Sequence, residues 1–313
     1  MVNPQIVERT ACPACHAKSF TSIYALPEGS AIIRNYLDEF YRAQGGVDHE
    51  LLAGWKFELL QCADCSLVFQ KFILGHHLME VLYEKWINPA VTFEMSRQHP
   101  LLYYLNLVEE VKQLVTWFNK RPDHLRVLDF GMGWAEWCKV AAALGCQAYG
   151  AELSPARQAN ARAHNIQVID VTACAPDFFD AINTEQVFEH IPDPLVSLRH
   201  LATLVRPGGL IKISVPDSYM LKKLLKLNDW NAPKGTENSL NVVAPLEHIN
   251  SFTHRSLAAT MASLAGLQPV PALTFQNYPQ SVMAGIKNKF RAHYIKWLRP
   301  NKGTYLYFQK PAA

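Results

Sequence analysis

Short apolar runs alternate with amphipathic stretches of helical periodicity between positions 101 and 215, and this alternation limits the possible folds more than any other feature. Apolar runs bounded by glycine or proline predict buried strands, and the amphipathic stretches predict helices. Parallel strands need a crossover connection, so alternating strands and helices form a mostly parallel sheet that is covered on both faces.

Seven strands are expected, at residues 126–130, 147–152, 167–169, 179–184, 210–215, 268–273 and 305–309. Helices are expected at residues 101–119, 134–144, 155–164, 194–205 and 253–265. Glycine just past a helix end and a Pro-Gly turn before a strand support these boundaries. We therefore predict an α/β fold with a doubly wound, mostly parallel sheet of seven strands.

The turn after the first expected strand lies within DFGMGWAEW and carries Gly131 and Gly133. Glycine tolerates positive φ and lets the backbone approach a ligand closely, and the following helix directs free N–H groups to the same place. A dinucleotide fingerprint would need a small residue where Glu136 stands, which argues against NAD. Asp129 and Glu152, at the ends of the first two strands, fit a ligand with a cationic amino-acid tail and a ribose diol.

Four segments resemble the successive motifs of class I S-adenosylmethionine-dependent methyltransferases: VLDFGMGWAEW, YGAELSP, FDAINTEQVFEHIPDP and LVRPGGLIKISVPD. The resemblance covers residues 125–309 and implies a Rossmann-like methyltransferase fold, with S-adenosylmethionine as the cofactor. It implies that the glycine turn holds the methionine end, that Glu152 holds the ribose and that Asp170 lies near the adenine. Glu185 and Gln186 would line the methyl-transfer face. The cofactor-binding residues predicted in this way are Asp129, Gly131, Gly133, Trp134, Glu152, Leu153, Asp170, Glu185, Gln186 and Tyr83.

Several of these residues also have a purely structural interpretation. Asp129 could cap the helix that follows it, and Glu152 could be a solvated loop acid. His190, in FEHIPDP, is interpreted as a packing and hydrogen-bonding residue and not as a catalytic base. The family usually has a third glycine where Ala135 stands, a departure that tightens the loop without removing the site.

Two CxxC pairs near the N-terminus predict a metal site. Cys12 and Cys15 form the first pair, and Cys62 and Cys65 form the second. Each pair can supply two thiolates at adjacent corners of a tetrahedron, and four sulfurs with no open position describe a structural zinc ion. The alternative is a chance pairing of reduced thiols. We expect a zinc-binding module at residues 1–85 and a methyltransferase domain at residues 86–313.

CPAC followed by CADCSLVF resembles the N-terminal metal-binding module of a group of bacterial enzymes that includes sugar C-methyltransferases. Tyr83 resembles a tyrosine that reaches the cofactor in those relatives. In the same relatives a histidine follows a glutamate in a segment comparable to 245–250, which here reads PLEHIN. His248 is therefore the predicted catalytic base, with Glu247 beside it, and the alternative is a structural role shared by the two residues.

The 30 basic and 27 acidic residues leave a formal charge of +3, which argues against a protein whose main task is to bind nucleic acid. A basic stretch at 287–302 is interpreted either as a solvated helix face or as contact with a phosphate-bearing or membrane-surface partner. The N-terminus does not resemble a signal peptide, and no apolar run is long enough for a membrane span. We expect a cytoplasmic protein.

Three functions are compatible with these features. The first is methylation of a polar small molecule such as a sugar or a nucleotide-sugar. The second is RNA methylation, but TEQVF stands where an enzyme that methylates amino nitrogens in nucleic acid would have an Asn-Pro-Pro-Tyr-type motif. The third is a non-catalytic binding protein that has kept the cofactor fold. The presence of Asp129, Gly131, Gly133 and Glu152 favours an active enzyme over this third function.

Overall fold

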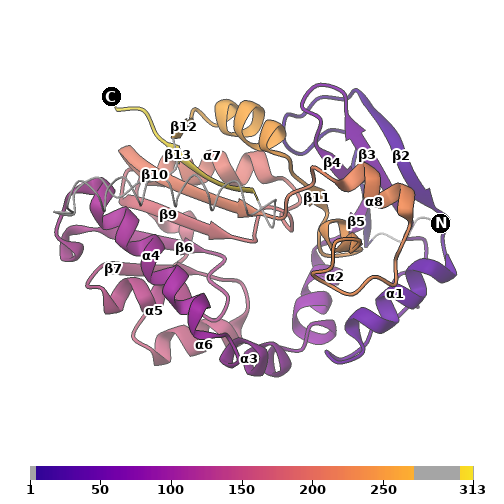
Figure 1. Ribbon diagram of the computed structural model, residues 1–313, viewed down its shortest axis with the longest axis horizontal. Coiled ribbons are helices and arrows are strands. Elements are labelled where there is room, and N and C mark those ends of the chain that lie inside the picture. The colour runs from indigo at the N-terminus through magenta and orange to yellow at the C-terminus, as the bar shows by residue number, and fades with distance from the viewer. Residues whose placement is uncertain (1–4, 271–303, 313) are drawn as a thin grey trace, which may run out of the picture.

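The computed structural model describes residues 5–270 and 304–312. The described strands include a seven-stranded sheet, in the order β12-β13-β10-β9-β6-β7-β8, that fills the left half of Figure 1. Strands β8, β7, β6, β9 and β10 run parallel, and β13 is antiparallel to both β10 and β12. Its strands are β6 (Arg126–Phe130), β7 (Gln147–Ala151), β8 (Gln167–Val168), β9 (Phe179–Glu185), β10 (Val205–Val215), β12 (Gln268–Val270) and β13 (Thr304–Gln309).

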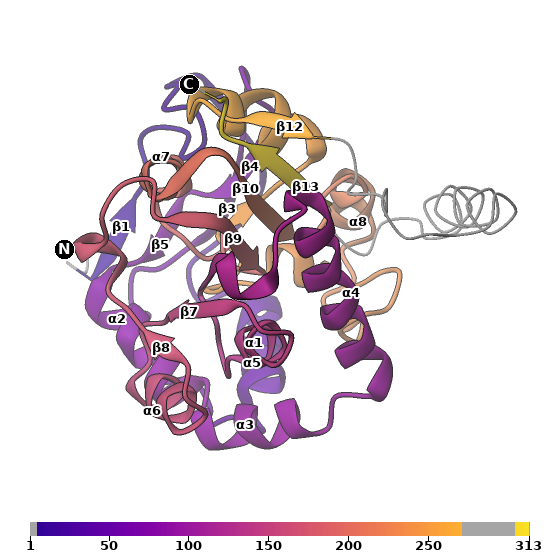
Figure 2. The same cartoon turned by 90° about the vertical axis from the view of Figure 1, so that its left-hand side faces the viewer.

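Helices cover both faces of this sheet, as Figure 2 shows for α4 and α7. Apolar residues of α4, α5 and α6 pack in one core cluster with residues of β6 and β7, and those of α7 and η5 pack in another with residues of β9 and β10. The predicted fold class is confirmed. The helices are α4 (Leu101–Phe118), α5 (Glu136–Ala143), α6 (Pro155–Ala163), α7 (Pro194–Leu204) and the π-helix η5 (Arg255–Ala262), with short 3₁₀ turns η2 (Pro122–His124) and η3 (Val171–Ala173).

Some predicted boundaries differ from the structure. The strand predicted at 210–215 begins at Val205, because the Pro-Gly-Gly turn is taken up as an irregularity in the register between β9 and β10. Only residues 268–270 of the strand predicted at 268–273 belong to the described part of the chain. The basic stretch at 287–302 lies outside the described residues.

The N-terminal region contains a second, antiparallel sheet in the order β11-β4-β3-β2, in the right half of Figure 1. A two-stranded ribbon of β1 and β5 lies beside it. The strands are β1 (Ile6–Glu8), β2 (Phe20–Leu26), β3 (Phe57–Cys62), β4 (Val68–Gln70), β5 (Phe72–Leu74) and β11 (Asn250–Ser251). The helices before α4 are α1 (Ala31–Tyr41), α2 (His76–Val81), the π-helix η1 (Leu82–Trp86) and α3 (Pro89–Arg97).

The segment between β10 and η5 returns to this N-terminal sheet. It contains α8 (Leu221–Leu227) and η4 (Leu240–Val243) and ends in β11, which pairs with β4. Its residues Trp230 and Leu246 pack in one apolar core with Tyr41 and Phe57 of the N-terminal region. The residues just before β11 therefore lie where the two sheets meet, which is where Glu247 and His248 are found.

Among the described residues, none of the helices combines the length and the apolar character that crossing a membrane requires.

Candidate cofactor and acceptor site

The glycine turn after β6 has the conformation that the sequence predicts. Gly131 and Gly133 have φ values of 74° and 53°, in the left-handed region that favours glycine. A Cβ at position 131 would lie 2.6 Å from the Val187 side chain, whereas no described atom lies within 4 Å of a Cβ built at position 133. Gly131 and Met132 donate their N–H groups to the Ala151 carbonyl, at 2.9 and 3.1 Å, so the turn is fixed to the end of β7.

Ala135, at the position of the missing third glycine, also lies in the left-handed region, with a φ of 64°. The residue is fully buried, and its N–H donates to the Met132 carbonyl at 2.8 Å. An L-residue in this region carries a strain of roughly 1–2 kcal/mol. The glycine turn therefore stores strain next to the predicted site.

Glu152 connects the end of β7 to the glycine turn. Its Oε2 accepts a hydrogen bond from the Gly133 N–H at 3.0 Å, and its Oε1 accepts from the N–H groups of Leu153 and Ser154 at 2.8 and 3.0 Å. A carboxylate has about four acceptor sites, and Arg157 Nη1, 3.8 Å from Oε2, lies beyond hydrogen-bond distance, so one site on Oε2 stays available for a ligand. Glu152 is thus held next to the glycine turn and is not a freely solvated acid.

A cavity opens beside the glycine turn and is rich in acidic groups. Among the described residues, its lining includes the carboxylates of Glu110, Asp129, Glu136 and Glu185 and the ammonium group of Lys212. These charges give the cavity a negative balance, which suits a cationic ligand.

Lys212 is almost completely buried in the middle of β10. Its Nζ lies 2.8 Å from Glu110 Oε2 and 2.6 Å from Glu185 Oε2, and the nearby carboxylates raise its pKa although burial acts in the opposite direction. The ammonium group therefore joins α4 to the end of β9 at one wall of the cavity. Lys212 and Glu110 were not predicted, although a lysine inside the apolar run LIKISV was a signal that could have identified Lys212.

Asp129 lies on the floor of the cavity and is 3% exposed. Asn183 Nδ2 donates to its Oδ1 at 2.6 Å. Burial is the largest influence on this carboxyl group and raises its pKa to about 7, while the Asn183 hydrogen bond acts in the opposite direction. Asn183 Oδ1 is itself buried and has no hydrogen-bond partner within the described part of the chain, so it can accept from a ligand.

Of the remaining predicted cofactor residues, Trp134 lies in the lining of the cavity, and Gln186, Leu153 and Asp170 do not. Trp134 lines the cavity, and its ring lies 4.8 Å from the Phe93 ring. Gln186, at the end of β9, has a φ of 54° and donates its N–H to the Ser214 carbonyl. Leu153 and Asp170 lie on the surface beyond the cavity, where Asp170 accepts a hydrogen bond from the Thr172 N–H. The cavity thus unites Asp129, Gly131, Gly133, Trp134 and Glu185, and Glu152 adjoins it through Gly133.

Tyr83 lies in a separate buried cluster with the predicted catalytic residues. Its hydroxyl is 3.1 Å from His190 Nδ1, which also lies 2.9 Å from the Glu247 carbonyl. The His190 and His248 rings are 5.0 Å apart, and Tyr41 donates its hydroxyl to Glu247 Oε1 at 2.6 Å. Burial lowers the pKa of both histidines, that of His190 to about 4, so both rings are neutral at pH 7.

The segment that carries Glu247 and His248 is clamped by two N-terminal residues. The buried guanidinium of Arg9 donates to the Ile249 carbonyl at 2.6 Å and to Asn250 Oδ1 at 2.7 Å. Gln70 Nε2 donates to the Ala244 and His248 carbonyls at 3.2 and 3.1 Å. The N-terminal sheet therefore fixes the backbone on which the predicted base stands.

Leu246, directly before the predicted catalytic pair, has a φ of 72° although it is a bulky buried residue. Such a conformation is an outlier for a large side chain, and outliers of this kind cluster at functional sites. The strained backbone supports the choice of the 245–250 segment as part of the site.

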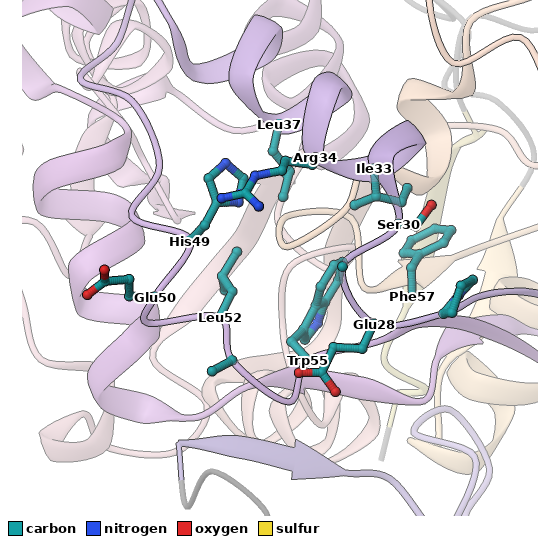
Figure 3. Close-up of a pocket in the computed structure, with 13 residues that line it drawn as sticks. Glu28, Ser30, Ile33, Arg34, Leu37, His49, Glu50, Leu52, Trp55 and Phe57 are labelled. Atoms are coloured by element: carbon teal, nitrogen blue, oxygen red, sulfur yellow. The ribbon is translucent and has the colours of Figure 1, made fainter.

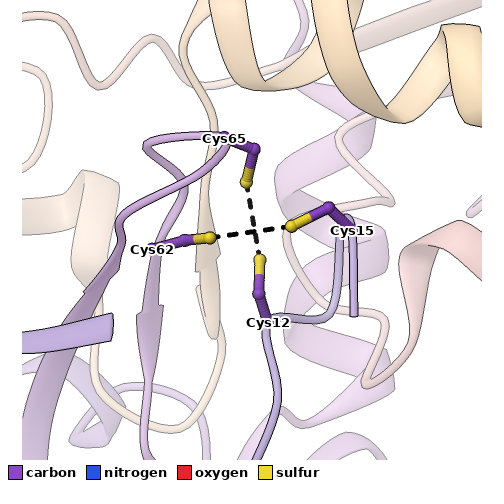
Figure 4. Close-up of side chains that lie close together, drawn as sticks. All are labelled: Cys12, Cys15, Cys62 and Cys65. Atoms are coloured by element: carbon purple, nitrogen blue, oxygen red, sulfur yellow. Dashed lines mark hydrogen bonds between the residues drawn. The ribbon is translucent and has the colours of Figure 1, made fainter. Parts of the chain in front are cut away.

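The four predicted metal ligands lie together at the edge of the N-terminal sheet (Figure 4). Cys12 Sγ is 3.5 Å from Cys65 Sγ, and Cys15 Sγ is 3.6 Å from Cys62 Sγ. Backbone N–H groups of Ala14, Ala17 and Leu67 bond to sulfurs of the cluster. Because N–H groups stabilise thiolates, this arrangement can hold a metal ion.

Both CxxC turns place a residue with positive φ directly after their second cysteine: His16 with a φ of 60° and Ser66 with a φ of 66°. We expect Ser66→Gly to raise the free energy of unfolding by about 1 kcal/mol, because glycine removes the left-handed strain. The measurement is denaturant unfolding of the metal-loaded protein. Ser66→Ala keeps the strain and is the matched control, so equal stability of the two variants would contradict the explanation.

A second cavity lies in the N-terminal region between α1 and the 49–57 segment (Figure 3). Leu37, Trp55 and Phe57 contribute apolar surface to its lining, which also includes Arg34 and His49, close to Leu37. None of the predicted site residues lines it.

The comparisons with known proteins agree with this geometry. A family model described as "Methyltransferase domain" matches residues 101–272, more than half of the chain. The ubiquinone biosynthesis O-methyltransferase of Xanthomonas campestris pv. campestris (strain B100) is 31% identical over 142 residues, which cover 39% of this chain and 58% of that protein. The protein of the same name from Aeromonas salmonicida (strain A449) is 31% identical over 191 residues, which cover 54% of this chain and 74% of that protein. The chain thus spans less than two thirds of the Xanthomonas relative's length.

Among solved structures, the plantazolicin methyltransferase BpumL, in complex with SAH, has a similar fold. Its TM-score is 0.50 at 15% sequence identity, and the superposition covers 75% of this chain and 94% of that protein. At this level of identity the similarity concerns the fold alone.

Proposed function

Since the chain belongs to the methyltransferase domain family, we propose that it transfers a methyl group from S-adenosylmethionine to a polar small molecule. The observation that carries this proposal is the acidic cavity beside the glycine turn. S-adenosylmethionine has a sulfonium and an ammonium group, and a cavity in which carboxylates outweigh a single buried lysine among the described residues favours such a ligand.

The polar atoms around the glycine turn fit this cofactor. The Asn183 amide oxygen, unpartnered among the described residues, can accept from the ammonium group. The left-handed turn at Gly131 and Gly133 keeps side chains away from the methionine portion. Glu152 would hold the ribose: one hydroxyl can use the free Oε2 site, and a second bond there needs the Gly133 N–H to be released. Trp134 and Glu185 line the same cavity and complete the proposed set there. Leu153, Asp170, Gln186 and Tyr83 stand outside its lining and are proposed from the resemblance alone.

The bound cofactor supplies an activated methyl group, so the protein mainly aligns the acceptor and removes its proton. We assign the role of base to His248, which is neutral and whose Nδ1 lone pair has no partner in the described part of the chain. Glu247 is tied to Tyr41 and therefore serves to position this segment. The Arg9 and Gln70 clamp holds the same segment from the other side.

We propose a hydroxyl group as the reacting group of the acceptor. The relatives are O-methyltransferases by name, and a neutral histidine is a suitable base for a hydroxyl. A sugar or a nucleotide-sugar is our candidate within this class, because the two CxxC pairs resemble those of sugar-modifying enzymes.

The four-cysteine cluster is proposed to bind a structural zinc ion. Zinc with Zn–S bonds of roughly 2.3 Å in a tetrahedron places its sulfurs about 3.8 Å apart. The Sγ–Sγ distances of 3.5 and 3.6 Å are close to this value. We assign residues 1–85 to the zinc-binding module and 86–313 to the methyltransferase domain. From the second segment, α8 and η4 complete the apolar core of the module, and β11 adds a strand to its sheet.

Transfer of labelled methyl groups from S-adenosylmethionine to a panel of polyhydroxylated acceptors tests the activity. With an acceptor found, we expect His248→Ala to reduce kcat by roughly 100-fold or more, with little change in cofactor affinity. His254→Ala, six positions away and exposed, is the matched control. Unchanged turnover of His248→Ala would exclude His248 as the base.

A further inference from the structure

Three side chains in the cluster that includes the proposed base, His248, direct potential ligand atoms toward one another. Glu189 and His190 follow β9, and His248 precedes β11. A carboxylate oxygen of Glu189 and one ring nitrogen from each histidine all lie within 4.8 Å of one another. Small side-chain movements would bring all three to roughly 2.1 Å from a common point, the distance of a metal–ligand bond.

Glu189 is the unusual member of this group, because it is a buried carboxylate that no cation pairs with among the described residues; burial raises its pKa, and its own backbone N–H acts in the opposite direction. It is 1% exposed, and neither carboxylate oxygen has a hydrogen-bond partner in the described part of the chain. His190 Nε2 lies 3.8 Å from Glu189 Oε1, beyond hydrogen-bond distance. Burying an unpaired carboxylate is costly, so such groups either take up a proton or bind a cation.

The hydrogen bonds of the two histidines leave one lone pair of each ring free. His190 Nδ1 donates to the Glu247 carbonyl, so its Nε2 carries the lone pair and faces Glu189. The His248 ring bonds to the Asn241 carbonyl, and its Nδ1 has no partner among the described residues. A ring that donates one N–H to a backbone carbonyl and keeps its other nitrogen free is the usual arrangement of a metal-binding histidine.

We propose that Glu189, His190 and His248 form a binding site for a first-row divalent cation such as Mn²⁺, separate from the four-cysteine cluster. Two imidazoles and one carboxylate leave coordination positions open for an oxygen ligand. The thiolates of the cysteine cluster prefer a soft or borderline ion, whereas the nitrogen and oxygen donors of this site also suit Mn²⁺. The two sites can therefore be distinguished chemically.

A role of this ion in methyl transfer rests on the proposed function, whereas binding of the ion to the three side chains does not. An acceptor hydroxyl on an open coordination position would have a lowered pKa and would lose its proton to bulk water. Its oxygen would then form the bond to the methyl carbon while the S–CH₃ bond breaks, and the cofactor leaves as the neutral thioether. While His248 Nδ1 binds the ion it cannot accept a proton, so the role of base assigned to His248 belongs to the ion-free protein, and in the ion-bound protein the ion activates the acceptor hydroxyl.

The test is a titration with Mn²⁺ of the full-length protein that carries one zinc ion per chain, the number the four-cysteine cluster holds, because excess zinc would also occupy a site of two histidines and one glutamate. Electron paramagnetic resonance reports the free Mn²⁺. We expect one Mn²⁺ to bind per chain, and we expect Glu189→Gln and His248→Ala each to weaken this binding at least tenfold. Glu109→Gln, on the exposed side of α4, is the control and should bind Mn²⁺ as the wild type does. Absence of Mn²⁺ uptake by the wild type would overturn the proposal and leave Glu189 as a buried, protonated acid.

Thermal unfolding of the same samples keeps the proposal testable if a variant folds poorly. Glu189→Gln removes the buried charge, so without Mn²⁺ it should melt at or above the wild-type temperature, and Mn²⁺ should stabilise only the wild type. Equal stabilisation of both proteins would contradict the site. Binding of S-adenosylhomocysteine, measured in parallel, distinguishes the cation site from the proposed methyltransferase function. If the protein binds S-adenosylhomocysteine but not Mn²⁺, only the cation site is contradicted.

Discussion

Glu152→Ala is expected to weaken the binding of S-adenosylhomocysteine by roughly 100-fold, which corresponds to about 2.7 kcal/mol. The substitution removes the proposed ribose ligand and also the acceptor of the Gly133, Leu153 and Ser154 N–H groups. Because the same carboxylate would bind the ligand and also fixes the glycine turn, its loss removes a ligand contact and loosens the turn. Isothermal calorimetry measures the effect.

Two further variants separate binding from folding. Glu152→Gln keeps the size of the side chain and one carbonyl oxygen, so we expect an intermediate loss of roughly tenfold. Glu94→Ala, an exposed acid on α3 that pairs with Arg97, should bind the ligand as the wild type does. An alanine variant at position 152 that melts normally and binds within threefold of the wild type would exclude Glu152 as a ligand.

Removal of the metal from the four-cysteine cluster is the second change with a large expected effect. A structural zinc ion contributes about 10 kcal/mol or more of apparent binding free energy in small zinc domains. Even half of this value would lower the melting temperature by roughly 10 °C or more in a protein of this size. The cluster packs in the same core as Leu195 and Phe188 of the methyltransferase domain, so the loss should extend beyond the N-terminal sheet.

Cys12→Ser tests this expectation, with metal analysis and thermal unfolding as the measurements. We expect about one zinc per chain in the wild type, reduced zinc content in the variant and a lower melting temperature. Cys146→Ser is the matched control, because Cys146 is also a buried cysteine but lies outside the cluster. Less than half a zinc per chain in the gently purified wild type would contradict the four-thiolate site.

The seven-stranded sheet could be predicted because the sequence patterns that specify its strands and helices are local. The strands from β6 to β9 lie within one or two residues of their predicted ranges, and the glycine turn adopts the expected left-handed conformation. Apolar runs, glycine positions and helix periodicity act over a few residues, so they are visible without the structure. The four-cysteine cluster could be predicted for the same reason, because each CxxC pair is a local motif.

The contacts that complete the site are long-range and leave no local pattern. The pairing of β11 with β4, the Tyr41 hydrogen bond to Glu247 and the Glu110 ion pair with Lys212 join residues about a hundred or more positions apart. Such contacts form only when whole helices and strands pack together and close long loops of the chain, so no short stretch of sequence predicts them. The unpaired Glu189 carboxylate was invisible for the same reason, since only the fold shows that it has no partner among the described residues.

Calorimetric titration of the wild-type protein with S-adenosylhomocysteine tests the central claim most directly. If the acidic cavity and the glycine turn form a cofactor site, the titration gives one binding event per chain with a micromolar dissociation constant. No heat of binding at millimolar ligand, from a protein that is folded and carries its metal, would contradict the account.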